Sequence, residues 1–272
     1  MTLPSTPRAV VTGAGGGLGR ALCLELARRK ARILVSDLDL GAAVDTARQV
    51  VALGAQAETE RCDVTDAAQV EALAVRAEQA FGGVDLLVNN AGVAVSGDIG
   101  DIPLADWKWI FSINLWGVVH GCHAFVPRMK KQRSGHILNV ASAAGLLSSA
   151  NMGPYNVTKA GVIALSETLA SELAPFGVGI TALCPTFFQT NIVDAARSSG
   201  GPELEALAKK LMAKSKLQAP DVARVALGAC DAGQLYCVPM ADGQWAWRTK
   251  RLAPETFYKR ILPGVLQRLR ER

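Results

Sequence analysis

The sequence predicts an α/β fold, in which a doubly wound parallel sheet lies between two layers of helices in a single domain. Short β-rich runs alternate with amphipathic helical stretches along most of the chain, an order typical of strand–helix–strand units in a parallel sheet. Several of the expected strands are continuously apolar, as they should be when helices cover both sheet faces. The 272 residues suit one large domain of this kind.

The individual strands and helices can be assigned in chain order. Strands are expected near residues 8–12, 33–36, 58–62, 85–88, 136–140, 180–184 and 235–238. Helices are expected near residues 18–30, 42–53, 63–80, 107–131, 155–174 and 221–230. Gly54 would end the second helix, Asp63 or Thr65 would begin the third, and Gly82 would end the third.

The composition is that of a folded protein with a large apolar core. Hydrophobic residues make up 50% of the chain and charged residues 19%, which argues against disorder. The N-terminal residues carry no signal-peptide pattern, and no apolar stretch approaches the roughly 20 residues of a membrane span. We therefore expect a cytoplasmic protein, whose six cysteines, without metal-ligand spacing, are reduced and buried.

The positive charge of the chain is concentrated at its C-terminal end. Residues 248–272 hold eight Lys or Arg and two Glu, a net charge of +6, which leaves −1 for the other 247 residues of a chain whose total is +5. A general nucleic-acid-binding surface is not supported, because the bases of the body are balanced by acids.

A glycine-rich turn joins the first strand to the first helix. It reads Thr12-Gly13-Ala14-Gly15-Gly16-Gly17-Leu18-Gly19. Glycines let the backbone turn tightly and approach a pyrophosphate, and the following helix N-terminus supplies free N–H groups. This position at the start of the chain is typical of a Rossmann-type dinucleotide site.

Asp37 closes the second strand, 18 residues after Gly19. A carboxylate there can accept hydrogen bonds from the adenosine ribose and would repel the 2′-phosphate of the phosphorylated cofactor. No base follows directly, and the nearest base of the glycine turn is Arg20. Both features favour NAD over NADP, while the alternative is that Asp37 is only a turn or cap residue.

Tyr155 and Lys159 are four residues apart on an expected helix and so share one face. A phenol with a pKa of about 10 is a poor base at neutral pH, but a neighbouring ammonium can lower that pKa. The pair could then act in general acid–base catalysis. Ser142, just after the fifth strand, lies where open α/β sheets bind ligands and could bond a substrate oxygen.

Asparagines add two further polar features to the same region. The run Asn89-Asn90-Ala91-Gly92 ends the fourth strand, and Asn114 interrupts an apolar helical stretch. A buried Asn needs hydrogen-bond partners, so Asn114 could belong to a hydrogen-bonded chain that leads toward Lys159.

Taken in order, these residues resemble the short-chain dehydrogenase/reductase superfamily. The matching features are the Thr12–Gly19 turn, Asp63 after the third strand, Asn89–Gly92, Asn114, Ser142 and the Tyr155-x-x-x-Lys159 pair. The resemblance covers residues 8–238 and implies an NAD-dependent oxidoreductase that acts on alcohols or carbonyls and forms a homodimer or homotetramer.

The resemblance also implies a role for each matching residue. Tyr155 would be the acid–base residue, Ser142 would orient the substrate oxygen, and Lys159 would hold the ribose and tune Tyr155. Asn114 would support a water relay to Lys159. The cofactor would be held by the turn residues Gly13, Gly16, Gly17, Leu18 and Gly19, and by Asp37, Asp63, Val64, Asn90, Ala91, Gly92, Tyr155, Lys159, Pro185 and Thr190.

One segment departs from the family pattern. After the sixth strand the family usually has Pro-Gly with a Thr four residues later, and here Pro185 and Thr190 are in place but Thr186 replaces the glycine. The residues expected to line the substrate pocket are uncharged: Val93, Ala94, Val95, Ala143, Ala144, Leu146, Met152, Phe187 and Phe188. They predict an apolar alcohol or ketone, such as a steroid, retinoid-like, long-chain or aromatic compound.

We expect residues 1–242 to form the dehydrogenase domain, with a mobile substrate lid near residues 190–217 that contains a helix over 203–212. Residues 243–272 would be a basic amphipathic extension, helical from Phe257 with a break at Pro263-Gly264. Two alternatives stay open for the extension. It could be a peripheral membrane anchor, or it could pack against the body or a partner subunit.

Two alternatives to the dehydrogenase also stay open. The chain could be a non-catalytic dinucleotide-binding regulator or scaffold, although such a protein has no need of Tyr155. It could be a lyase of the same fold, such as a halohydrin dehalogenase, which lacks the dinucleotide site; Lys159 and Asp37 argue against this.

Overall fold

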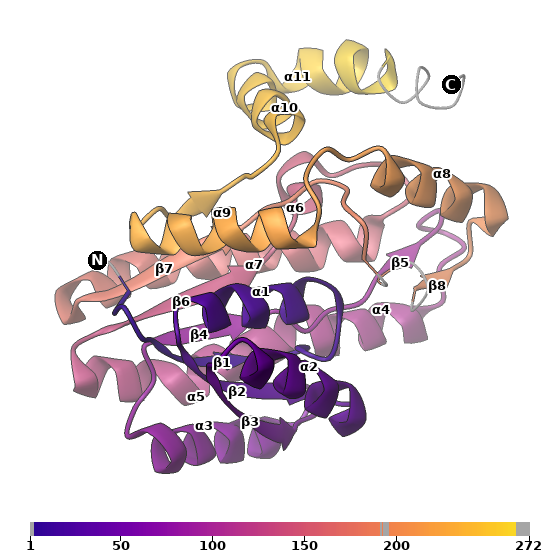
Figure 1. Ribbon diagram of the computed structural model, residues 1–272. Helices are drawn as coiled ribbons and strands as arrows, with labels where there is room; N and C mark the ends of the chain where they lie inside the picture. Colours follow the sequence, from indigo (N-terminus) through magenta and orange to yellow (C-terminus); the bar gives the residue numbers. More distant parts are fainter. Residues whose placement is uncertain (1–2, 191, 193–195, 265–272) are drawn as a thin grey trace.

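The central sheet is parallel and doubly wound, as predicted. The computed structural model describes residues 3–190, 192 and 196–264. Within them, the large sheet has seven strands in the order β3-β2-β1-β4-β6-β7-β9 (Figure 1). These strands are β1 (Arg8–Val11), β2 (Arg32–Asp37), β3 (Gln56–Arg61), β4 (Leu86–Asn89), β6 (Gly135–Val140), β7 (Val178–Leu183) and β9 (Tyr236–Cys237). The winding direction reverses between β1 and β4.

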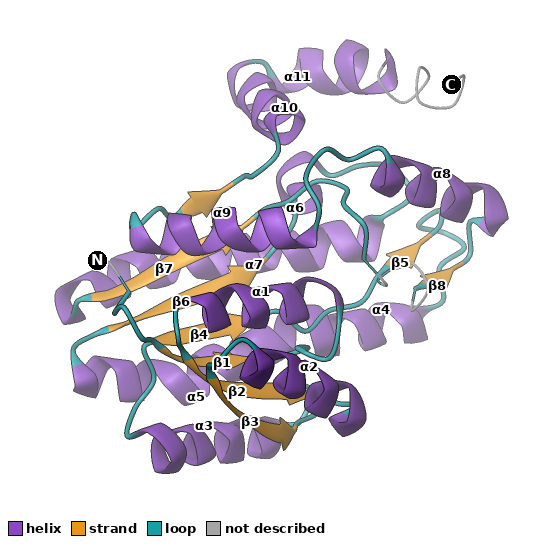
Figure 2. Ribbon diagram, in the orientation of Figure 1, coloured by secondary structure: helices purple, strands orange, loops and turns teal. Residues whose placement is uncertain are grey.

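Helices connect the strands on both faces of the sheet, which gives three layers (Figure 2). They are α1 (Gly17–Arg28), α2 (Leu40–Ala52), α3 (Ala67–Phe81), α4 (Leu104–Phe111), α5 (Gly117–Gln132), α6 (Ala143–Leu147), α7 (Gly153–Leu173), α8 (Gly201–Ala213) and α9 (Ala219–Asp231). A π-helical turn, η1 (Ser112–Trp116), joins α4 to α5, and a 3-10 turn, η2 (Ala174–Phe176), follows α7.

Alternate residues of each strand enter two separate cores. Ala9 and Val11 of β1 pack with α1, α2 and α9, whereas Val10 packs with α3, α5 and α7 on the opposite face. All three side chains are fully buried. This alternation explains why the strand sequences are continuously apolar.

Several boundaries differ from the sequence expectation. Neither Asp63 nor Thr65 begins α3; its N-cap is Asp66, whose carboxylate accepts the Ala68 N–H at 2.9 Å. Asp63 instead accepts the Thr65 N–H at 2.9 Å and stiffens the loop before the cap. Gly82 ends α3 in the left-handed conformation, with φ 75°, as predicted.

Short elements absent from the prediction lie near the carboxyl ends of the main strands. β5 (Val95–Ser96) and β8 (Arg197–Ser198) form a small second parallel sheet. The guanidinium of Arg197 lies 3.9 Å from the centroid of the Trp109 ring and 2.7 Å from the Asp106 carboxylate. α8 follows this sheet and matches the helix expected at residues 203–212.

The C-terminal part of the chain folds against the body as far as the structure describes it. α10 (Ala241–Leu252), α11 (Pro254–Thr256) and the π-helical turn η3 (Phe257–Ile261) form this segment, which lies next to α6 (Figure 1). We call residues 241–264 the extension. Residues 262–264 are helical, so the expected break at Pro263-Gly264 is wrong. The apolar positions expected at Val265, Leu266 and Leu269 lie outside the described residues.

Among the described residues, one helical stretch is long and apolar enough to cross a membrane by length and composition. Residues 104–132 reach a mean hydropathy of 1.2, although no such stretch was expected from the sequence. Half of the apolar window is buried inside the protein, and the core helix of a globular domain passes the same test.

Candidate functional site

The predicted site residues gather at one edge of the sheet, because every strand of the main sheet points the same way. The glycine turn follows β1, Asp37 ends β2, Asp63 follows β3, and Asn90 follows β4. Ser142 follows β6 in the same manner. This is the edge at which open α/β sheets bind ligands.

The glycine turn is locked against the end of β4. Gly13 has a φ of 61°, and a Cβ there would lie 2.7 Å from the Ala91 Cα. A Cβ at Gly19 would lie 2.2 Å from the Gly13 carbonyl oxygen. The Asn90 side-chain amide donates to the Thr12 and Gly13 carbonyls, both at 2.9 Å. The backbone path at this turn therefore requires glycine at positions 13 and 19.

The start of α1 fits a pyrophosphate group. Gly16 is the N-cap and provides no side chain to cap the first turn of α1. A Cβ at Gly16 would meet no heavy atom within 4 Å, so the backbone faces open space. The first N–H groups of a helix need acceptors, and a phosphate supplies them. Leu18 is buried in the core below the turn.

Asp37 both shapes the turn and presents a carboxylate beside it. One oxygen accepts the Gly15 N–H at 2.8 Å, and the other accepts the Asp39 N–H at 3.0 Å. Asp37 is therefore a turn residue, but each carboxylate oxygen can accept further hydrogen bonds. Arg20 is already engaged, since its guanidinium donates to Thr46 Oγ1 at 2.9 Å and to the Gly15 carbonyl.

Val64 and Thr190 lie at the two sides of this edge. Val64 is buried against α5, where a Cβ at Gly117 would come within 2.8 Å of a Val64 methyl carbon. The backbone oxygen of Val64 lies 2.9 Å from His120 Nδ1. Thr190 approaches the glycine turn, because its Cβ lies 3.9 Å from a Cβ built on Gly17.

Tyr155, Lys159 and Ser142 lie beside the carboxyl end of β6, where Tyr155 and Lys159 are buried and Ser142 is half-buried. Tyr155 and Lys159 lie on α7 with 9% and 3% of their surface exposed. The Lys159 ammonium lies 5.7 Å from the centroid of the Tyr155 ring and donates to the Val140 carbonyl at 2.8 Å. Ser142 caps α6 by accepting the Ala144 N–H at 3.1 Å, and its hydroxyl also lies 3.5 Å from the Pro185 carbonyl oxygen.

Burial controls the protonation of this group. Desolvation raises the pKa of Tyr155, and the hydrogen bond from Ser142 opposes that rise. Desolvation also lowers the pKa of Lys159 to about 8. Burial of the phenol therefore outweighs the opposing hydrogen bond, and the pKa of Tyr155 lies above its usual value.

Asn114 occupies the π-helical turn η1 and is fully buried. Its side chain accepts the Val93 N–H at 2.8 Å and donates to the Val93 carbonyl at 2.9 Å. A longer contact of 3.5 Å reaches Thr158 Oγ1. A Cβ at Gly92 would lie 3.3 Å from Asn114 Oδ1 and 3.5 Å from Lys159 Nζ. The Asn114 and Lys159 side chains therefore both lie beside Gly92.

An apolar cluster surrounds Tyr155. Its predicted members are Val93, Ala94, Val95, Ala144 and Met152. Sequence reasoning did not place Ile102, Trp107, Trp109, Ile110 and Phe111 in the pocket, because no motif marks them as neighbours of Tyr155. Phe188 packs instead with the α1 and α9 core, and Phe187 is 40% exposed.

The segment after β7 connects the site to the extension. The Pro185 carbonyl accepts the Ala143 N–H at 2.9 Å. Thr186 Oγ1 lies 3.3 and 3.4 Å from the two carboxylate oxygens of Asp242, in the first turn of α10. The threonine that replaces the usual glycine therefore contacts the extension.

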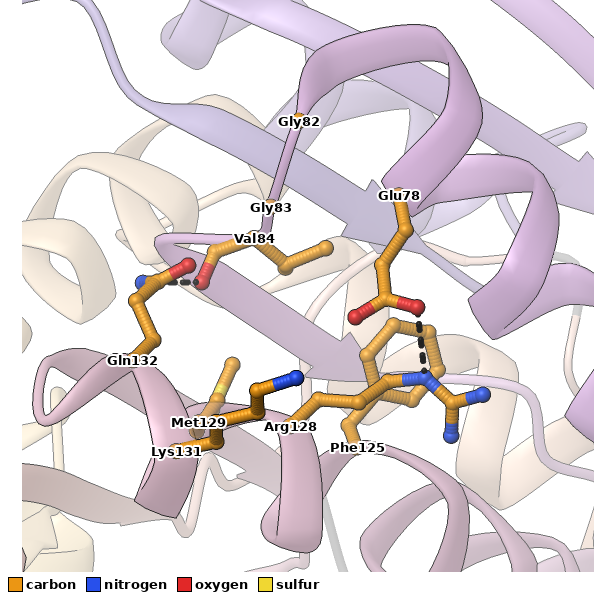
Figure 3. Close-up of a pocket in the computed structure, with 9 residues that line it drawn as sticks. All are labelled: Glu78, Gly82, Gly83, Val84, Phe125, Arg128, Met129, Lys131 and Gln132. Atoms are coloured by element: carbon orange, nitrogen blue, oxygen red, sulfur yellow. Dashed lines mark hydrogen bonds and ion pairs between the residues drawn. The ribbon is translucent and has the colours of Figure 1, made fainter.

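A separate pocket of about 290 Å³ lies at the opposite edge of the sheet (Figure 3). It is bordered by the ends of α3 and α5, where Glu78 pairs with Arg128 at 3.2 Å and Gln132 donates to the Val84 carbonyl at 3.1 Å. The Glu78 carboxylate and the Arg128 guanidinium therefore form an ion pair at the border of the pocket. None of the predicted site residues lines this pocket.

Comparison with known proteins gives consistent matches. Residues 7–200 match the protein family described as short chain dehydrogenase. EphD of Mycobacterium tuberculosis, named an oxidoreductase, is 41% identical over 184 residues, 67% of this chain but only 31% of EphD. The chain therefore spans about a third of that relative's length.

Two further proteins match over nearly the whole chain. SadH of Mycobacterium tuberculosis, also named an oxidoreductase, is 34% identical over 260 residues, 94% of each protein. A Burkholderia phymatum short chain dehydrogenase/reductase, solved in complex with NAD, superimposes with a TM-score of 0.85. It is 37% identical, and the match covers 91% of this chain and 93% of that chain.

Proposed function

Because the chain belongs to the short-chain dehydrogenase/reductase family, we propose that it transfers a hydride between NAD and an apolar alcohol or ketone. The observation that carries this proposal is the pair of buried side chains Tyr155 and Lys159 on α7, with the Lys159 ammonium 5.7 Å from the centroid of the Tyr155 ring and bound to the Val140 carbonyl, two residues before Ser142. These residues lie at the edge of the sheet that also holds the glycine turn.

The proposed NAD site follows from the groups left available at that edge. The first-turn N–H groups of α1 would hold the pyrophosphate, and Asp37 the adenosine ribose. Asp63 and Val64 would flank the adenine, while Asn90, Ala91, Gly92, Pro185 and Thr190 would line the rest of the site. When bound, NAD supplies the hydride acceptor or donor.

Tyr155 would hold the proton that moves to or from the substrate oxygen. The Ser142 hydroxyl would orient that oxygen toward Tyr155, and the Lys159 ammonium would favour the phenolate form. Asn114 would act indirectly, as a positioning residue, because its side chain holds the Val93 backbone beside Gly92. Burial of Tyr155 and Lys159 would limit the access of water to the proton transfer.

The proposed preference for NAD rests on Asp37 and Arg20. Asp37 would face the ribose and repel a 2′-phosphate. Arg20 is bound by Thr46 and the Gly15 carbonyl, so it is not free to compensate that repulsion. The apolar cluster around Tyr155 supports an apolar substrate, such as a steroid, retinoid-like, long-chain or aromatic alcohol.

The assembly we propose is a cytoplasmic homodimer or homotetramer. Trp116 on η1 and Val157 on α7 expose 55% and 49% of their surfaces, which suits helices that pack against a second copy. All six cysteines are free and buried, as in a reducing compartment. Light scattering behind size-exclusion chromatography measures the assembly.

A screen for NAD⁺ reduction tests the proposed function. Steroids, retinol, aliphatic alcohols and aryl alcohols are offered to the wild type, with NADP⁺ in parallel. We expect turnover of at least one apolar class, faster with NAD⁺. NAD binding without turnover on any class would favour the regulator alternative, and absence of NAD binding would favour the lyase.

A further inference from the structure

The helix that begins at Ser142 depends on outside contacts. α6 has five residues and ends at Ser148, which has a left-handed φ of 54°. So short a helix is not stable alone and leaves its last carbonyl oxygens without partners inside the helix. The groups that satisfy those carbonyls therefore help to decide where Ser142 lies.

Two side chains of the extension satisfy them. Lys250 Nζ donates to the Leu146 carbonyl at 2.5 Å, and the Tyr258 hydroxyl donates to the Leu147 carbonyl at 2.9 Å. Lys250 Nζ also lies 5.4 Å from the centroid of the Tyr258 ring. The two donors thus support each other across the end of α6.

A third contact joins the extension to the segment after β7. The Asp242 carboxylate lies beside the Thr186 hydroxyl and accepts the Gly243 N–H at 2.8 Å. A Cβ at Gly243 would lie 2.7 Å from Thr186 Cγ2. A glycine at position 243 therefore makes room for the threonine at position 186.

α6 transmits these contacts to the catalytic helix. A Cβ at Gly145 would lie 2.6 Å from the Lys159 carbonyl carbon and 2.7 Å from the Ala160 nitrogen. The backbones of α6 and α7 are therefore in direct contact at Lys159. A shift of α6 would change the position of Ser142 relative to both Tyr155 and Lys159.

We propose that the extension is a positioning element of the active site. Lys250 and Tyr258 hold the end of α6, and Asp242 holds the Thr186 segment, so that Ser142 stays aligned with Tyr155. The inference rests on the proposed function, because it assumes that Ser142 orients the substrate oxygen.

The double variant Lys250→Met Tyr258→Phe tests the proposal, since it removes both donors and keeps their apolar parts. We expect kcat to fall on the order of tenfold through misplacement of Ser142, with the Kd for NAD unchanged. The loss should be much smaller when Ser142→Ala is already present, because coupled groups are not additive. The single variant Lys250→Arg keeps a donor at position 250 as well as Tyr258, so it should retain most of the wild-type kcat.

Lys259→Met is the matched control. It removes the same charge from the extension, but Lys259 is exposed and pairs with Glu255 at 2.7 Å, away from α6. We expect wild-type kcat and KM for this variant. An equal loss in Lys259→Met would overturn the proposal.

Hydrogen exchange gives a readout independent of turnover. The amides of residues 143–148 should exchange faster in Lys250→Met Tyr258→Phe than in the wild type or Lys259→Met. Unchanged exchange, or faster exchange with unchanged kcat, would overturn the positioning role. A wild type that shows no turnover in the substrate screen, with the exchange difference intact, would overturn the proposed function alone.

Discussion

Tyr155 is held in surroundings that oppose its ionisation. Burial raises its pKa, and the hydrogen bond from Ser142 opposes that rise. We expect Tyr155→Phe to reduce turnover at least about a hundredfold, because the proton-transferring group is lost. The Kd for NAD should stay nearly the same, as measured by fluorescence titration. Retained turnover in Tyr155→Phe would refute the proposed acid–base residue.

Lys159 makes stability depend on pH. Burial lowers its pKa from 10.5 to about 8, so the folded protein holds a costly buried ammonium below that pH. As pH rises from about 8 to 10.5, the folded state releases the proton before the unfolded state does, so the free energy of unfolding rises. Relative to Lys159→Met, wild-type stability should rise by about 2 kcal/mol from about pH 7 to about pH 10. Urea unfolding of both proteins at both pH values measures this change. A difference between wild type and Lys159→Met that is the same at both pH values would contradict the effect of burial on the pKa of Lys159.

Asp37 should determine the choice of cofactor. Asp37→Ala removes the charge that would repel a 2′-phosphate, so the ratio of kcat/KM for NAD⁺ to that for NADP⁺ should fall by roughly tenfold or more. The variant also loses acceptors for Gly15 and Asp39, so thermal unfolding serves as a control for local damage. A wild type that already prefers NADP⁺ would contradict the interpretation of Asp37.

At the scale of elements, the contact of α6 with α7 depends on one glycine. In Gly145→Ala, the added methyl group would overlap the backbone at Lys159 and push the two helices apart. Overpacking of this kind costs about 1–3 kcal/mol, and kcat should fall because Ser142 moves. Gly228→Ala is a matched control, since a Cβ there meets nothing within 4 Å. Equal stability and activity of the two variants would contradict the tight contact.

The sequence predicted most long elements, although it missed α10, and it predicted the short ones poorly. Apolar periodicity identifies the strands of the main sheet and helices such as α7, because burial repeats along them. α6 and the two-residue strands β5 and β8 are too short to show a period. Their positions are set by tertiary contacts, such as Arg197 with Trp109.

Residue-level predictions failed where neighbours compete for one position. Asp63, Thr65 and Asp66 can all cap a helix, and only the three-dimensional path of the loop selects Asp66. Phe187 and Phe188 are adjacent and equally apolar, yet one is 40% exposed and the other buried against α1 and α9. Motif spacing was a better guide than local residue type, because Ser142, Tyr155 and Lys159, which the motifs linked, do lie in the same region of the structure.

For the whole molecule, the described part of the extension favours packing on the body over membrane anchoring. The Trp247 ring packs at a tilt against the Tyr236 ring, with ring centroids 5.0 Å apart, and Phe257 is buried. Trp245 and Leu252 remain 55% and 87% exposed on α10. Among the described residues of α10, these two large apolar side chains face outward and would be available to a lipid surface.

Flotation with vesicles of anionic phospholipid tests the two alternatives. We expect little flotation of the wild type, and the same amount for Trp245→Ser Leu252→Ser, because the extension already has a protein surface to pack on. Substantial wild-type flotation that this variant loses would support the anchor. Light scattering of both proteins checks that the assembly is unchanged.

The π-helical turn at Asn114 has a consequence for the phase of the long helix around it. Its extra residue rotates α4 relative to α5 by about 100° compared with an uninterrupted α-helix. Ile110 can then face the cluster at Tyr155 while Phe125 faces the main core. Deletion of one residue within 112–116 would restore the ordinary helical period but leave one of these two faces turned toward solvent. The rotation between α4 and α5 therefore allows one long helical segment to pack against both the cluster at Tyr155 and the sheet core that contains Phe125.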